Sequence, residues 1–101
     1  MADQYKDKYD TFERSSVRDR ELNLTNHDTA NALSYLAAKE YEAYTAHNGK
    51  HGSVSKRDKV IRGIVGPIVD REFTAKNLYF LDKKAVVEAT VSNVERAEKV
   101  V

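Results

Sequence analysis

The apolar residues of this chain recur with the period of an α-helix over most of its length. Near the start, Tyr5, Tyr9 and Phe12 occupy positions i, i+4 and i+7 between charged residues, which places all three on one helix face. The pattern predicts a first helix that ends near Ser15 or Ser16. Its aromatic face is expected to pack against a core or an interface.

A second helix is indicated over residues 29–47, after a connection formed by residues 22–28. Its shared apolar face consists of Ala30, Leu33, Leu36, Ala37, Tyr41 and Tyr44. Thr25, Asn26 and Asp28 can each accept a hydrogen bond from the free amides of a helix start, so one of them is expected to cap it. Gly49 provides a suitable stop.

The third segment, residues 54–70, has a broad apolar face. This face consists of Val60, Ile61, Ile64, Val65, Ile68 and Val69. Ser53 or Ser55 is the expected cap, and Ser55 and Asp58 have the spacing of a capping box. Because Pro67 has no amide proton, a helix here must kink or stop near Gly66. A strand is the alternative, since the run is rich in Val and Ile, but a kinked helix is preferred.

Two patterns fit residues 78–101. A helix capped by Asp82 places most valines on one face and leaves only Glu98 on the wrong side. A β-hairpin with strands over residues 77–81 and 85–91 is the alternative. The predicted fold class is therefore mainly α, a compact three- to four-helix domain, with a C-terminal β-hairpin in place of part of the last helix as the other option.

Composition limits the class of protein further. The chain has 101 residues, 41% of them hydrophobic, which suits a single domain over residues 1–101. Charged residues make up 33% but nearly cancel to +1, and there is no cysteine for a disulfide, a thiolate metal site or a thiol nucleophile. The longest apolar run is too short to cross a bilayer, so we expect no membrane association and a cytoplasmic location.

Positive charge gathers in one place, residues 49–63, where five Lys and Arg residues accompany a single acid. The candidate anion or nucleic-acid contacts are Lys50, Lys56, Arg57, Lys59 and Arg62. In a helix-turn-helix or winged-helix arrangement, residues 29–47 would form the supporting helix, residues 54–70 the recognition helix and the hairpin a wing. The long connection and the neutral net charge speak against specific base recognition.

Catalytic and metal-binding patterns are weak. His47 and His51 have the i, i+4 spacing of two metal ligands, but Gly49 breaks the helix between them. His27 and Asp28 are adjacent and point apart on a helix, and Ser53 and Ser55 are better explained as caps. We therefore predict no catalytic residues, no metal ligands and no cofactor, and that the protein is not an enzyme.

Surplus apolar material suggests a protein interface instead. The candidate interface residues, which fall outside or widen the main helical stripes, are Tyr35, Phe73, Val86 and Val100. The predicted function is a small non-enzymatic interaction protein, a helical homo-oligomeric accessory or assembly module that binds itself or another protein. The alternative is a nucleic-acid-binding regulator that uses the basic segment, residues 50–62.

Overall fold

The computed structural model describes residues 1–49 and 52–100, with side chains as far as Glu98. These residues form a short 3-10 helix and five α-helices and contain no strand. The elements are η1 (Ala2–Tyr5), α1 (Lys6–Arg14), α2 (Val17–Asn23), α3 (Asn26–Asn48), α4 (Val54–Lys76) and α5 (Lys83–Val100). The molecule is mostly helical, as predicted, and is an elongated bundle of 44 × 23 × 19 Å.

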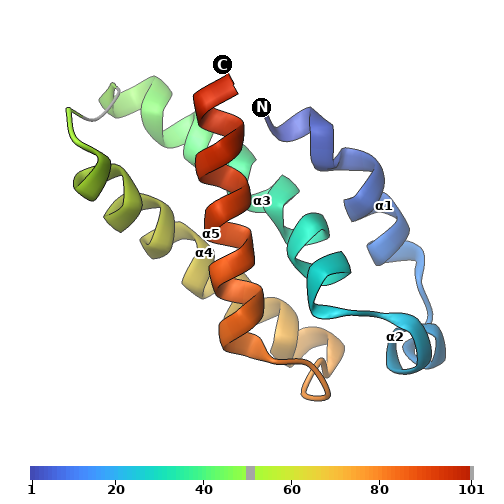
Figure 1. Ribbon diagram of the computed structural model, residues 1–101. Helices are drawn as coiled ribbons and strands as arrows, with labels where there is room; N and C mark the ends of the chain where they lie inside the picture. The colour runs from blue at the N-terminus through green and yellow to red at the C-terminus, as the bar shows by residue number, and fades with distance from the viewer. Residues whose placement is uncertain (50–51, 101) are drawn as a thin grey trace.

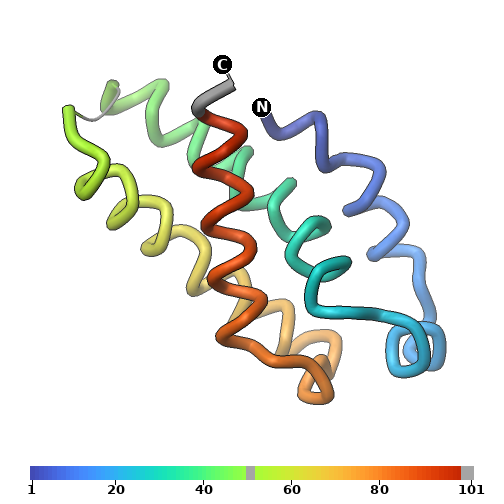
Figure 2. Tube along the Cα trace, viewed as in Figure 1, coloured from blue at the N-terminus to red at the C-terminus, as the bar shows by residue number. Residues whose placement is uncertain are grey.

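Helix α3 lies at the centre of this bundle. It packs against η1, α1, α4 and α5, and α5 also packs against α4 (Figure 1). Helices α3 and α4 run in opposite directions. The two chain ends lie at one end of the bundle, whereas α2 and the turn of residues 77–82 lie at the other (Figure 2). At that second end, the backbone N–H of Asp82 donates to Asn26 Oδ1 at 2.9 Å and ties the turn to the start of α3.

Side-chain caps define where most helices begin. The capping residues, each accepting a hydrogen bond from a backbone N–H in the first turn, are Ser16, Thr25, Ser53 and Asp82. Thr25, Ser53 and Asp82 were among the predicted caps and are confirmed. The Ser55–Asp58 capping box was wrong, because α4 already begins at Val54 and the Asp58 carboxylate accepts from Arg62 instead.

Three predictions about the elements need correction. The C-terminal β-hairpin is absent from the described residues, because the helical period continues from Val86 to Ala97 on one buried face. The described residues form five α-helices instead of three or four, since no element was predicted for residues 17–21 and the end of α2 was assigned to the connection of residues 22–28. Helix α4 runs to Lys76, beyond the predicted end at residue 70, and the strand alternative for this segment is wrong; the preferred interpretation as one helix that includes Pro67 stands.

The core lies between α3, α4 and α5, and α1 closes one side of it with Phe12. Its largest members, each at most 3% exposed, are Phe12, Leu33, Tyr41, Ile61, Val65, Ile68, Val69, Phe73, Leu78, Val86, Val91 and Val94. Buried alanines on α3, such as Ala30 and Ala37, allow neighbouring helices to approach closely. Among the described residues no helix is long and apolar enough to cross a membrane.

Candidate interaction surfaces

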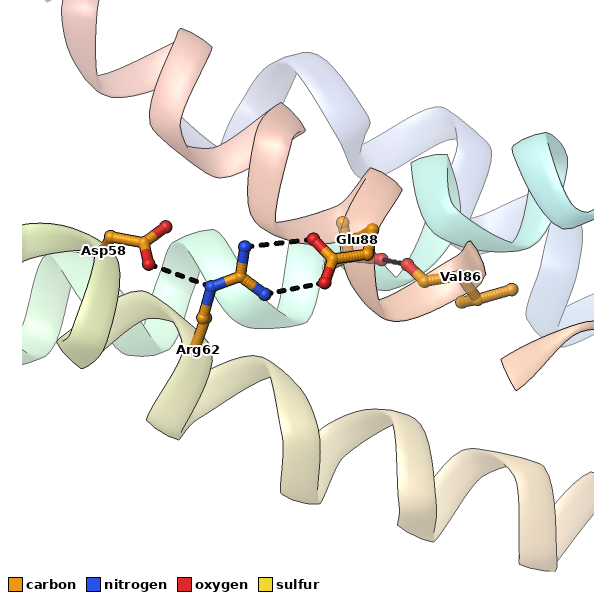
Figure 3. A network of polar contacts seen from close by, with 5 residues as sticks. Asp58, Arg62, Val86 and Glu88 are labelled. Atoms are coloured by element: carbon orange, nitrogen blue, oxygen red, sulfur yellow. Dashed lines mark hydrogen bonds and ion pairs between the residues drawn. The ribbon is translucent and has the colours of Figure 1, made fainter. Parts of the chain in front are cut away.

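Arg62, one of the predicted nucleic-acid contacts, is paired with acids of its own chain, although its side chain is 43% exposed. Its Nε donates to Asp58 Oδ2 one turn earlier, and its two terminal nitrogens donate to both carboxylate oxygens of Glu88 on α5, each at 2.9 Å (Figure 3). This is the bidentate geometry in which guanidinium and carboxylate bind most strongly. The same contacts raise the pKa of Arg62 and lower the pKa of Glu88. The Arg62 side chain therefore clamps α4 to α5.

Arg57 also forms an ion pair within the chain. Its Nε lies 3.5 Å from Glu98 Oε2, and the two side chains are only 14% and 17% exposed. Tyr41 of α3 is buried beside them, and burial together with a hydrogen bond to Glu98 raises the pKa of Tyr41 to about 12. The group joins three helices, which explains why Glu98 stands on the apolar side of α5.

A carboxyl pair links α4 to α5 between these two arginines. A hydrogen bond between the side chains of Asp58 and Glu95 requires one of them to keep a proton. That hydrogen bond, with Arg62 adding to it, lowers the pKa of Asp58, whereas the same bond together with burial raises the pKa of Glu95. Of the two carboxyl groups, Glu95 therefore holds its proton to the higher pH.

The other three predicted nucleic-acid contacts are the lysines Lys50, Lys56 and Lys59. Lys56 and Lys59 are exposed on α4 and make no ion pair with any described residue, so they are available to an anion. Lys50 lies outside the described residues. Helices α3 and α4 form an antiparallel pair (Figure 1), whereas a helix-turn-helix crosses at a steep angle. The basic segment thus offers two adjacent lysines on a helix surface.

Two of the four predicted interface residues are buried in the core of the single chain. Phe73 and Val86 are 2% and 0% exposed within the single chain, which corrects the expectation that they are surplus to its core. Tyr35 is half-buried, and its ring lies 5.1 Å from that of Tyr9, centroid to centroid. The side chain of Val100 lies outside the described residues. Of the three candidates whose side chains the structure describes, Tyr35 alone retains surface that a partner could contact.

Large exposed apolar side chains lie at the end of the bundle that carries α2 and the turn of residues 77–82 (Figure 2). We call four large side chains there the apolar end: Val17 (56% exposed), Leu22 (69%), Tyr79 (69%) and Phe80 (44%). Helix α2 buries none of its side chains, so Val17 and Leu22 contribute little to the fold of the single chain. Large apolar side chains exposed at one end of a molecule make that end a candidate interaction site.

The family of the chain follows from comparison with known proteins. The model of a family described as "Virulence factor CipC-like" matches residues 8–100. The chain belongs to this family. No curated protein and no solved structure matches it. The matched region contains both the basic segment and the apolar end, and it runs from within α1 to the end of α5.

In the part of the chain that the structure describes, no three His, Asp or Glu residues lie close enough together to hold a metal ion. His27 is exposed near the start of α3, where its ring contacts Asn31 at 3.2 Å, and Ser53 serves as a cap. The acids on α4 and α5 are engaged with arginines, lysines or one another; Asp70 and Glu72, for example, pair with Lys83 and Lys76.

The apolar end was not predicted from the sequence. Tyr79 and Phe80 were assigned to a strand of the alternative hairpin, and Leu22 to a connection. A usable signal was present, because Tyr79 and Phe80 stand directly before the helix cap Asp82, outside any helical stripe. Large apolar side chains in a short turn cannot all reach a core that the helices already fill.

Proposed function

We propose that this protein is a non-enzymatic interaction module that self-associates through its apolar end. The observation that carries the proposal is the exposure of Val17, Leu22, Tyr79 and Phe80 at one end of the bundle. Removing such side chains from water upon association lowers the free energy by roughly 25 cal/mol for each Å² of apolar surface buried. The family description, a virulence factor, names no reaction.

A second copy of the chain suits this surface because its charges are mixed. Arg18 and Glu21 flank the apolar residues of α2, while Asp82 and Lys84 follow the aromatic turn. In a two-fold interface the same patch meets itself, so a patch of one sign would repel its copy. The net charge of +1 adds little repulsion between whole molecules.

The narrow end of the bundle limits the expected affinity of self-association. Its cross-section of 23 × 19 Å is smaller than the roughly 800 Å² that each partner buries in a standard interface. Contacts below that size are typical of weak or transient complexes. We therefore expect a dimer with a dissociation constant in the micromolar range or weaker, in which Leu22 and the two aromatic residues supply most of the buried area.

Sedimentation equilibrium from low micromolar to millimolar protein tests this proposal. The wild-type chain should shift from monomer to dimer, whereas Leu22→Glu and Phe80→Glu should remain monomeric because a buried carboxylate would lack a partner. Val54→Glu is the matched control, since Val54 is 68% exposed but starts α4 at the opposite end. A wild-type chain that stays monomeric, or equal dimerisation of all variants, would overturn the proposal.

The nucleic-acid alternative has narrower support. Lys56 and Lys59 are exposed and lie one turn apart, but Arg57 and Arg62 are already bound to acids of α4 and α5. Two lysines favour a weak contact with a phosphate backbone without base recognition. An interaction module of this kind requires no cofactor, and the cytoplasmic location stays a prediction.

A further inference from the structure

A cleft of about 320 Å³ opens between α1, α2 and the start of α3, on the other face of α2 from the apolar end. Phe12 and Leu24 form its apolar part, and Lys8, Arg20 and Asp28 are among its polar lining. This volume lies at the small end of the range for ligand sites in proteins. The cleft is therefore suited to a small organic molecule with an apolar body.

Arg20 is the unusual group in this cleft. Its Nη1 donates to the backbone carbonyl of Ser15 at 2.7 Å, but its Nε is buried and has no hydrogen-bond partner in the described chain. No carboxylate of the described residues lies within ion-pair distance of this guanidinium. A half-buried guanidinium keeps its charge at any physiological pH, so it lacks the anion that usually compensates its partial loss of water.

The other charges around the cleft define the anion. Lys8 adds a second cation, which is exposed and forms no ion pair with any described residue. Asp19 and Asp28 also line the cleft and make the site neutral before a ligand enters. These two carboxylates would repel a doubly charged phosphate more strongly than a singly charged carboxylate. The planar fork of a guanidinium also matches a carboxylate.

We propose that this cleft binds a small organic carboxylate, with its apolar body against Phe12 and Leu24 and its carboxylate between Arg20 and Lys8. The site is independent of the apolar end and does not require self-association. Because the cleft is lined by one face of α2 while the opposite face carries Val17 and Leu22, ligand binding also holds in place the helix that buries no side chain of its own.

Titration of ¹⁵N-labelled protein with 3-phenylpropionate, followed by amide chemical shifts, tests the site. Saturable shifts are expected in α1, α2 and the start of α3, and uncharged 3-phenylpropionamide should bind about tenfold more weakly or worse. Arg20→Gln should reduce the affinity by a similar factor. Arg18→Gln is the matched control, because it removes the same charge from α2 outside the cleft and should leave binding unchanged.

Arg20→Gln also removes the hydrogen bond to Ser15 that helps to hold α2. Lys8→Gln is therefore a second variant that tests the site. Lys8 makes no contact that holds the fold, and its replacement should weaken 3-phenylpropionate binding by several-fold while the amide spectrum stays that of a folded chain. The proposal is overturned if 3-phenylpropionate causes no saturable shift. It is also overturned if the neutral amide binds equally well, or if both cleft variants bind like Arg18→Gln.

Discussion

The side-chain amide of Asn93 donates a hydrogen bond to the hydroxyl of Ser34, 3.0 Å away, and so joins α5 to α3 inside the core. The same amide nitrogen donates to Asn31 Oδ1 at 3.0 Å, and Arg96 donates to Asn93 Oδ1. The Ser34 hydroxyl in turn donates to the carbonyl of Ala30. These bonds require α3 and α5 to meet in one register, which smooth alanine and valine faces would not specify alone.

Replacing Asn93 with alanine should reduce the free energy of unfolding by about 1–3 kcal/mol, because Ser34 loses its donor and Arg96 its acceptor in a buried place. Urea denaturation measures this loss. Ser92→Ala is the control, since Ser92 is the exposed neighbour on the same helix, and it should change stability by less than about 0.5 kcal/mol. Equal stability of the two variants would show that the α3–α5 register does not depend on Asn93.

A glycine of α4 gives a variant that should be more stable than the wild type. Gly63 and Gly66 are helical, and a Cβ added at either would meet no atom of another element within 4 Å. Gly63→Ala should therefore raise the free energy of unfolding by about 0.5–1 kcal/mol, because alanine loses less backbone entropy in a helix. Gly66→Ala should not share this gain, because Gly66 directly precedes Pro67 and a Cβ there would clash with the proline ring in a helical backbone. Thermal or urea denaturation reports both changes. Destabilisation by Gly63→Ala would mean that another surface covers this face of α4.

The carboxyl pair predicts how stability depends on pH. The raised pKa of Glu95 stabilises the folded chain below the ordinary value of 4.5, and this contribution is lost as pH rises through the raised pKa. The lowered pKa of Asp58 acts in the opposite sense, since its contribution is present above 3.8 and is lost as pH falls through the lowered value. The pair therefore stabilises the folded chain most between the ordinary pKa values of 3.8 and 4.5, and its contribution decreases on either side.

Glu95→Gln should remove the loss of stability that accompanies deprotonation of Glu95 at higher pH, because the glutamine amide donates to Asp58 without a titrating proton. Relative to the wild type, the variant should become more stable as pH rises from about 4.5 towards neutrality. Urea denaturation at several pH values measures this difference in the free energy of unfolding. Glu88→Gln is the contrasting control: Arg62 lowers the pKa of Glu88, so this variant should lose stability at neutral pH. Parallel pH profiles for Glu95→Gln and the wild type would rule out proton sharing.

Binding to a nucleic-acid backbone is tested by fluorescence anisotropy of a labelled mixed-sequence duplex at low and near-physiological salt. If Lys56 and Lys59 form such a contact, binding should be weak, should decrease steeply with salt and should vanish in Lys56→Glu/Lys59→Glu. Lys8→Glu/Lys84→Glu makes the same charge change elsewhere and should retain it. Absence of binding at both salt concentrations would remove the nucleic-acid alternative.

The helices could be predicted because their signals are local. The apolar period of α3 and α5 and the caps Thr25, Ser53 and Asp82 depend on neighbouring residues alone. Helix α2 escaped prediction for the same reason, since it buries no side chain and therefore has no apolar period. The hairpin was wrong because valine suits both helix and strand until the pattern is followed to Ala97.

The candidate surfaces were harder to predict because they depend on which residues meet across helices. Arg57 and Arg62 belong to a basic run in the sequence, and only the packing of α4 against α5 brings Glu98 and Glu88 to them. Glu98 itself was a clue, as the one acid on the apolar side of the last helix. The Arg20 cleft needs α1, α2 and α3 together, and no spacing along the chain indicates it.

Both chain ends emerge from the bundle at the end opposite Val17, Leu22, Tyr79 and Phe80 (Figure 2). The N–H of Ala2 is held there by Glu42 Oε1 at 2.8 Å. Two copies joined through those four side chains would form a rod of roughly twice the 44 Å length, with every terminus at its tips. Whatever is fused to either terminus would be carried outward at the two tips, far from the joint and far from its counterpart.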